Sequence, residues 1–164
     1  MAKGTFNDKG LSEFIAAFGR VREKGLEAIA GEAIYEEAKV VADQVKQNLL
    51  ALQTSPERYR KTDQAYYLSP RQKQGLVDGF GIAPKRAEGN GWNVRLGFWN
   101  YNKVMTDTYP GGQPNAMIAR TVESGSTYMI KQPFFRSAVN ASKGPAKQAG
   151  TEAALKAFER IMGK

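Results

Sequence analysis

A continuous apolar stripe over residues 26–52 constrains the fold of this chain more than any other feature. Apolar side chains recur there at the spacing of one helix face, and the pattern ends before Ser55 and Pro56. The stripe is roughly 40 Å long at about 1.5 Å per residue, and it predicts a long helix over residues 26–55. Such a helix needs a partner surface along its length. We favour the protein's own sheet, and a neighbouring subunit is the second option.

The pattern on either side of this helix predicts a helical extension and a β-hairpin. The extension covers residues 1–25, and apolar side chains recur at helical spacing in it from Leu11 to Arg22, before Gly25 interrupts the pattern. Apolar and other side chains alternate from Trp92 to Trp99, as in a half-buried strand. Asn90 and Gly91 suit the tight turn of a hairpin, so we expect the partner strand over residues 77–85.

Two segments without a regular period read as loops. Residues 56–74 are rich in Arg, Lys, Gln and Tyr, and they predict an exposed basic loop or arm. Residues 100–115 form a second, polar loop between Asn100 and the Pro-Gly-Gly-Gln-Pro stretch. We expect both loops to contact partners.

The remaining pattern predicts one α+β domain over residues 1–164. The sheet region spans residues 75–132 and includes a short helix over 116–122 and a third strand over 127–132. Pro133 suits the first position of a helix. It opens the C-terminal helices, residues 133–164, which we expect to be broken at Gly144-Pro145.

The composition excludes several kinds of chemistry, because the chain contains no His and no Cys. Histidine is the commonest general acid or base and activates most catalytic serines, and zinc sites use Cys or His. The carboxylates of Asp78, Asp107 and Glu123 are left as candidates for hydrolysis, but their spacing brings no two of them together. We therefore expect no enzyme, no cofactor and no metal site, and no stretch is apolar enough to span a membrane.

Positive charge is concentrated in the middle of the chain. Residues 58–103 hold nine basic and three acidic side chains, whereas residues 1–57 hold seven basic and nine acidic ones. Basic and aromatic residues interleaved in this way are typical of nucleic-acid grooves and of protein interfaces. A solvated surface that binds nothing is equally compatible. The candidate interface residues are Arg58, Tyr59, Arg60, Lys61, Tyr66, Tyr67, Arg71, Lys73, Lys85, Arg86 and Arg95.

Two short motifs near the C-terminus resemble a known family. The stretch from Ala119 to Thr127 and the stretch from Gln132 to Ala138 are similar to motifs of the neck and tail-completion (tail-component, head-tail connector) proteins of long-tailed bacteriophages and prophages. The order of helices and strands agrees over roughly residues 26–162. The matching residues are Ala119, Val122, Glu123 and Gly125 in the first motif, and Pro133, Phe134, Arg136 and Ala138 in the second.

The resemblance implies a structural virion protein that forms a ring at the head-tail junction or the tail end. It implies self-association, with sixfold symmetry favoured over twelve copies, and contacts to neighbouring head-closure, connector, tail-tube or tail-terminator proteins. Assembly would occur in the cytoplasm of the bacterial host, and DNA passing through the lumen is an optional contact. The alternative function is a basic nucleic-acid-binding module, whose binding would weaken steeply with salt.

The motif residues also have a purely structural interpretation. Glu123 beside Gly125 is placed to accept hydrogen bonds from backbone N–H groups in a tight turn before the third strand. Phe134 and Phe135 would then anchor the last helical region on the core. We favour this interpretation over a chemical role for Glu123.

Overall fold

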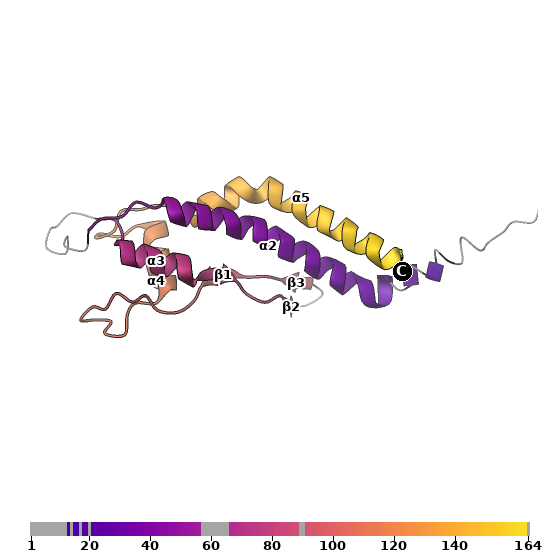
Figure 1. Cartoon of the computed structure of the whole chain (residues 1–164), viewed down its shortest axis with the longest axis horizontal. Coiled ribbons are helices and arrows are strands. Elements are labelled where there is room, and N and C mark those ends of the chain that lie inside the picture. The colour runs from indigo at the N-terminus through magenta and orange to yellow at the C-terminus, as the bar shows by residue number, and fades with distance from the viewer. Residues whose placement is uncertain are drawn as a thin grey trace, which may run out of the picture.

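Two long helices and a narrow β-ribbon make up the α+β fold (Figure 1), which confirms the predicted class. The computed structural model describes residues 13, 15–16, 18–19, 21–56, 66–88 and 91–163. A π-helical turn, η1 (Val21–Gly25), precedes the first long helix. The helices are α2 (Leu26–Ala51), α3 (Pro70–Gly79), α4 (Asn115–Ser124) and α5 (Phe135–Met162), and the strands are β1 (Phe80–Ile82), β2 (Arg86–Glu88), β3 (Gly91–Asn93) and β4 (Leu96–Phe98).

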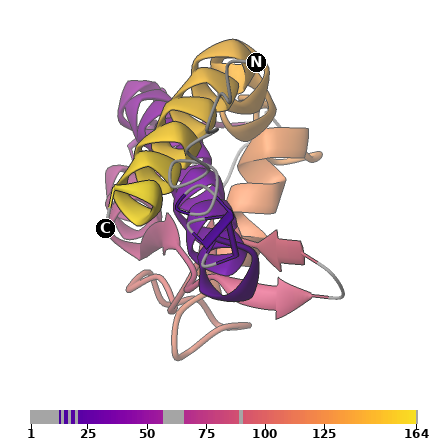
Figure 2. The ribbon, with the colours of Figure 1, turned by 90° about the vertical axis from the view of Figure 1, so that its right-hand side faces the viewer.

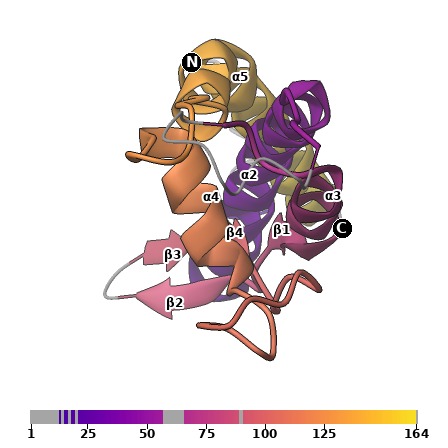
Figure 3. The same ribbon diagram turned by 90° about the vertical axis from the view of Figure 1, so that its left-hand side faces the viewer.

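The long helix α2 confirms the prediction from the apolar stripe. It lies between the β-ribbon on one side and α5 on the other (Figure 2, Figure 3), so the sheet that we favoured covers only part of its length. The two helices run antiparallel, with the start of α2 beside the end of α5 (Figure 1). Small side chains let them approach closely. On α5 the buried ones are Ala138, Ser142, Ala146, Gly150 and Ala157.

The predicted break at Gly144-Pro145 is wrong, because α5 continues through Pro145. Proline inside a helix removes one backbone hydrogen bond, here the one to the carbonyl of Ala141. Ala141 and Pro145 are both exposed, so water reaches that carbonyl. On the other face, Ser142 and Ala146 are buried. Packing of that face therefore outweighs the local cost of the proline.

Helix α3 corrects the predicted loop over residues 56–74, whose last five residues are helical. The hydroxyl of Ser69 accepts from the amide of Gln72 (3.2 Å), and the Gln72 side chain accepts from the Ser69 amide (2.9 Å). This reciprocal capping box, followed by Pro70 at the first helical position, starts the helix. Residues 57–65 of the predicted loop lie outside the described residues.

The predicted hairpin is confirmed, but its first strand begins at Phe80 rather than at residue 77, because α3 runs on to Gly79. Strands β1 and β4 pair antiparallel, and so do β2 and β3. Between the two pairs, three residues (83–85) face two (94–95), which is the geometry of a β-bulge. Pro84 lies in the bulge, where its missing backbone N–H removes no hydrogen bond between the strands.

The predicted third strand over residues 127–132 is wrong. Only Met129 forms an isolated bridge, parallel, with Tyr66. The hydroxyl of Ser126 accepts from the amides of Tyr128 (3.3 Å) and Met129 (3.1 Å). Side-chain bonds of this kind favour a turn over an extended ladder. The short helix predicted over 116–122 is confirmed as α4.

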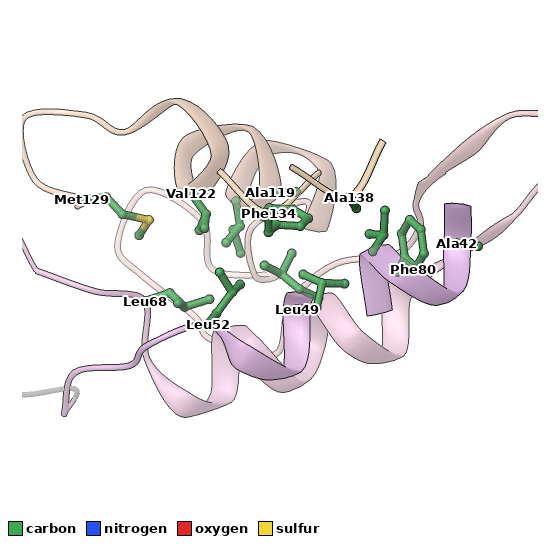
Figure 4. Close-up of a cluster of buried hydrophobic side chains, with 13 residues drawn as sticks. Ala42, Leu49, Leu52, Leu68, Phe80, Ala119, Val122, Met129, Phe134 and Ala138 are labelled. Carbon is green, nitrogen blue, oxygen red and sulfur yellow. The ribbon is translucent and has the colours of Figure 1, made fainter. Parts of the chain in front are cut away.

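The apolar core lies at one end of α2, where α3, α4 and the start of α5 meet it (Figure 4). Leu49 and Val122 are completely buried there. Phe80 packs against Phe98 with ring centres 5.2 Å apart, and Phe98 against Phe134 at 6.0 Å. Phe134 belongs to this core and Phe135 packs against it, which confirms that both anchor the last helix.

The N-terminal extension is described only in part. Residues 13, 15–16 and 18–19 are helical, and the other residues before Val21 lie outside the description. Ile15 and Phe18 are both exposed. Among the helices of the described residues, none is both long and apolar enough to cross a membrane.

Candidate interaction surface

The structure separates the predicted basic residues into groups with different environments. Arg58, Tyr59, Arg60 and Lys61 lie outside the described residues. Lys85, Arg86 and Arg95 belong to the ribbon, whereas Arg71 and Lys73 belong to α3, nearer the left end in Figure 1. The described members therefore do not form one continuous face.

Lys73 has a structural role. Its ammonium group donates to the carbonyl of Leu50 (2.6 Å) and to that of Leu52 (2.9 Å). The last carbonyls of a helix have no partner within the helix, and a cation is favourable at this end of the helix dipole. Lys73 therefore caps α2, which ends at Ala51 and not at the predicted residue 55.

Lys85 is also engaged within the chain. Its ammonium group lies 5.2 Å from the centre of the Trp92 ring, within the range of a cation–π interaction. Its side chain covers Gly31 of α2, where an added Cβ would overlap it. Arg86 and Arg95 are exposed on the ribbon.

Tyr66, Tyr67 and Arg71 come together with Lys103, Val104 and Met105 of the second loop, although at least 32 residues separate the two groups in the sequence. They line a hollow of about 450 Å³, called here the loop hollow. The side chain of Met105 on its wall is 70% exposed. Its described lining is Ser55, Pro56, Tyr66, Tyr67, Ser69, Arg71, Gln72, Lys103, Val104 and Met105, and none of these residues is acidic.

A second hollow of about 660 Å³ adjoins the loop hollow and shares Arg71 and Lys103 with it. Tyr101, 66% exposed, and Asp78 contribute to its lining. Asp78 accepts a hydrogen bond from the side-chain amide of Gln74 (2.8 Å). Arg71 and Lys103 therefore line both hollows.

Two buried asparagines hold the second loop against α3, and we did not predict them from the sequence. The Asn102 amide group donates to the carbonyl of Gln72 (3.2 Å) and to Oδ1 of Asn115 (3.3 Å). Asn115 in turn donates to the carbonyl of Trp99 (2.8 Å). The backbone amide of Val104 donates to Asn102 Oδ1 (3.1 Å), so the network orders the segment that carries Lys103.

Glycines on α3 make room for this network. A Cβ atom on Gly75 would overlap the Asn102 side chain, and one on Gly79 would lie 2.6 Å from the carbonyl oxygen of Trp99. The clue in the sequence is therefore two glycines four residues apart on one helix face, together with asparagines in the polar loop.

Replacing Gly79 by alanine is expected to lower the free energy of unfolding by about 1–3 kcal/mol. In a helix position with open space around it, the same change raises the free energy of unfolding by about 0.5–1 kcal/mol. Whether Gly79→Ala lowers or raises the free energy of unfolding therefore tests how the second loop packs against α3. Chemical denaturation measures the difference. Gly97 in β4 has no atom within 4 Å of an added Cβ and serves as the control, where only a small change is expected. A stabilised Gly79→Ala variant would contradict the placement of the loop.

The family-motif residues form a structural corner between α4 and α5. Gly125 has φ 76° and ends α4, where a Cβ would lie 2.9 Å from the Cβ of Lys131. Ala119, Val122, Phe134 and Ala138 are buried in the core, whereas Pro133 and Arg136 are exposed. The corner brings both motifs together in space.

Glu123 accepts backbone hydrogen bonds, as predicted, but from a different place. The amide of Phe135 donates to its Oε2 (2.8 Å) and the amide of Arg136 to its Oε1 (3.1 Å). These are unsatisfied amides of the first turn of α5, which a carboxylate caps favourably. The sequence predicted that Glu123 accepts from amides in the turn between α4 and a third strand. No strand forms there, and Glu123 instead binds the amides at the start of α5.

The arrangement offers no clustered set of metal ligands: among the described residues, no group of three Asp, Glu, His or Cys side chains could hold a metal ion. Comparisons with models of protein families, with curated proteins and with solved structures find no match to this chain. The resemblance to phage neck proteins therefore depends on the two motifs and the order of elements alone.

Proposed function

We propose that this chain is a structural subunit of a ring at the head-tail junction or tail end of a tailed bacteriophage. The observation that carries the proposal is the exposure of large apolar side chains at both ends of an elongated fold. One group lies at the start of α2 and along the last turns of α5: Leu26, Leu155 and Phe158. The other lies in the loops at the opposite end: Tyr101, Met105 and Tyr128.

Contiguous exposed apolar surface marks interaction sites, and the proposal takes each of these two groups as one such site. Because the two groups differ in their residues and lie at opposite ends, a contact between them is heterologous. Repeated contacts of that kind generate a ring when the rotation closes. The motif corner supports the phage assignment, because both motifs contribute to one junction that holds α5 on the core.

The purified full-length chain is expected to form a closed ring, with six copies as the favoured number. Light scattering during size-exclusion chromatography measures the mass, and electron microscopy shows the symmetry. Labelling of intact particles with an antibody against the chain is expected to mark the head-tail junction or the tail end. A protein that is monomeric at every concentration, and unlabelled in particles, would disprove the proposal.

A further inference from the structure

The first half of α5 and the segment before it carry positive charge without carboxylates. Residues 131–151 contain Lys131, Arg136, Lys143 and Lys147, and neither Asp nor Glu. All four side chains are exposed. Among the described residues, none of these four side chains has a hydrogen-bond or ion-pair partner. This region therefore presents cations that the described fold does not itself use.

Three of these cations lie on one face of α5. Arg136, Lys143 and Lys147 follow one another at intervals of seven and four residues, which are about two turns and one turn of a helix. They form a row roughly 16 Å long at about 1.5 Å per residue, called here the α5 stripe. Helix α5 lies along α2 on the side away from the ribbon (Figure 1).

Three carboxylates beside α5 do not pair with the stripe. Glu123 accepts from two backbone amides at the start of α5, and Glu152 accepts from the side chain of Gln148 (3.0 Å). Glu37 of α2 lies against Gly150, where an added Cβ would overlap it. Within the described part of the chain, no ion pair joins any of them to the stripe. The positive charge of the stripe is therefore not neutralised by a direct partner on α4, α5 or α2.

The surface around the stripe suits phosphate groups better than bases or apolar side chains. Residues 136–151 contain no aromatic residue and no Met, Leu or Ile. Protein interfaces are enriched in aromatic residues and Met, and grooves for single strands stack bases on aromatic rings. The backbone of duplex DNA is contacted by Lys, Arg and short polar side chains, such as the exposed Asn140. These features favour duplex DNA over an acidic protein or a single strand.

We infer that the α5 stripe binds the phosphate backbone of duplex DNA independently of base sequence. Contacts to phosphates position a protein on DNA but carry no sequence information. A few such contacts bind tightly only at low salt, so they guide DNA without immobilising it. Within the ring, α5 then faces the lumen, and this placement alone rests on the proposed function.

A double substitution in the full-length chain tests the inference. The stripe variant carries Lys143→Gln and Lys147→Gln, which remove two charges and keep residues that favour a helix. Fluorescence anisotropy of a short labelled duplex measures binding between about 50 and about 200 mM salt. The wild-type chain is expected to bind two duplexes of unrelated sequence equally well.

The stripe variant is expected to bind about tenfold more weakly, or less, at the lowest salt. Its plot of log binding constant against log salt concentration is expected to be less steep by about 2, since each phosphate contact contributes about 0.9 to the slope. Both effects follow from the loss of two phosphate contacts.

Two arginines of the ribbon provide a control with the same change of charge. Arg86 and Arg95 are exposed, and α2 lies between the ribbon and α5 (Figure 2). The control variant carries Arg86→Gln and Arg95→Gln and is expected to keep nearly all of the DNA binding and its salt dependence. Thermal melting of both variants shows that they are folded.

Three outcomes would overturn the inference and leave the proposed function intact. The first is a wild-type chain that binds no duplex at the lowest salt. The second is an equal salt dependence in the wild-type chain and the stripe variant, with or without a loss in the control. The third is a stripe variant that binds DNA normally but forms no rings, which would make the stripe a contact between copies. Conversely, a monomeric chain that is absent from particles and binds duplex through the stripe would overturn only the proposed function.

Discussion

Replacing Leu49 by alanine is expected to lower the free energy of unfolding by about 2–5 kcal/mol. Leu49 is completely buried in the core between α2, α3 and α4. Alanine would remove its transfer free energy and leave a cavity that the surrounding helices fill only in part. Urea denaturation monitored by circular dichroism measures the change, and an unaltered slope would show that the unfolded state is unaffected.

Leu50 provides a matched control for this prediction. It is the next residue of the same helix and the same amino acid, but its side chain is 61% exposed. Leu50→Ala is expected to change the free energy of unfolding by less than about 0.5 kcal/mol. Equal losses at the two positions would show that α2 presents a different face to the core.

Replacing Glu123 by alanine is expected to lower the free energy of unfolding by about 2–3 kcal/mol. The change removes the acceptor of two backbone amides at the start of α5, from Phe135 and Arg136. Hydrogen bonds to a charged acceptor are stronger than neutral ones, and the bond to Phe135 is partly buried. Thermal and chemical denaturation measure the loss.

Two further variants separate capping from a general effect of charge. Glu123→Gln retains one side-chain oxygen, so we expect about half of the loss. Glu152→Ala removes an exposed carboxylate of α5 that, among the described residues, accepts a hydrogen bond from Gln148 alone, and it is expected to be nearly neutral. If Glu123→Ala proved as mild as Glu152→Ala, Glu123 would not hold the corner between α4 and α5.

Local sequence patterns predicted an element correctly where the side chains on one face of that element determine its structure. The stripe from Leu26 to Leu52 predicted α2, because a helix of this length buries a stripe of this width. The alternation before Trp99 and the Asn90-Gly91 turn signal predicted the ribbon. Glu123 was correctly predicted to accept backbone amides, because a carboxylate near a chain reversal has few other partners.

Errors arose where a distant contact outweighed a local preference. Pro145 predicts a break when residues 141–149 are considered alone, but Ser142 and Ala146 are buried on the other face and keep α5 continuous. The apolar residues from 127 to 132 resemble a strand, yet they find no ladder beyond one bridge with Tyr66. The start of α3 was missed although its capping box, Ser69 to Gln72, is visible in the sequence.

The sequence by itself determined the α+β class, the long helix and the absence of His and Cys chemistry, because these follow from composition and from periodicity along one element. Only the tertiary structure decided which charged residues act together. Lys73 caps α2 by donating to the carbonyl of Leu50. Arg71 and Lys103, which are 32 residues apart in the sequence, line the same hollow. The physical reason is that Asn102 and Asn115 fold the second loop onto α3, and a contact between segments so far apart leaves no period in the sequence.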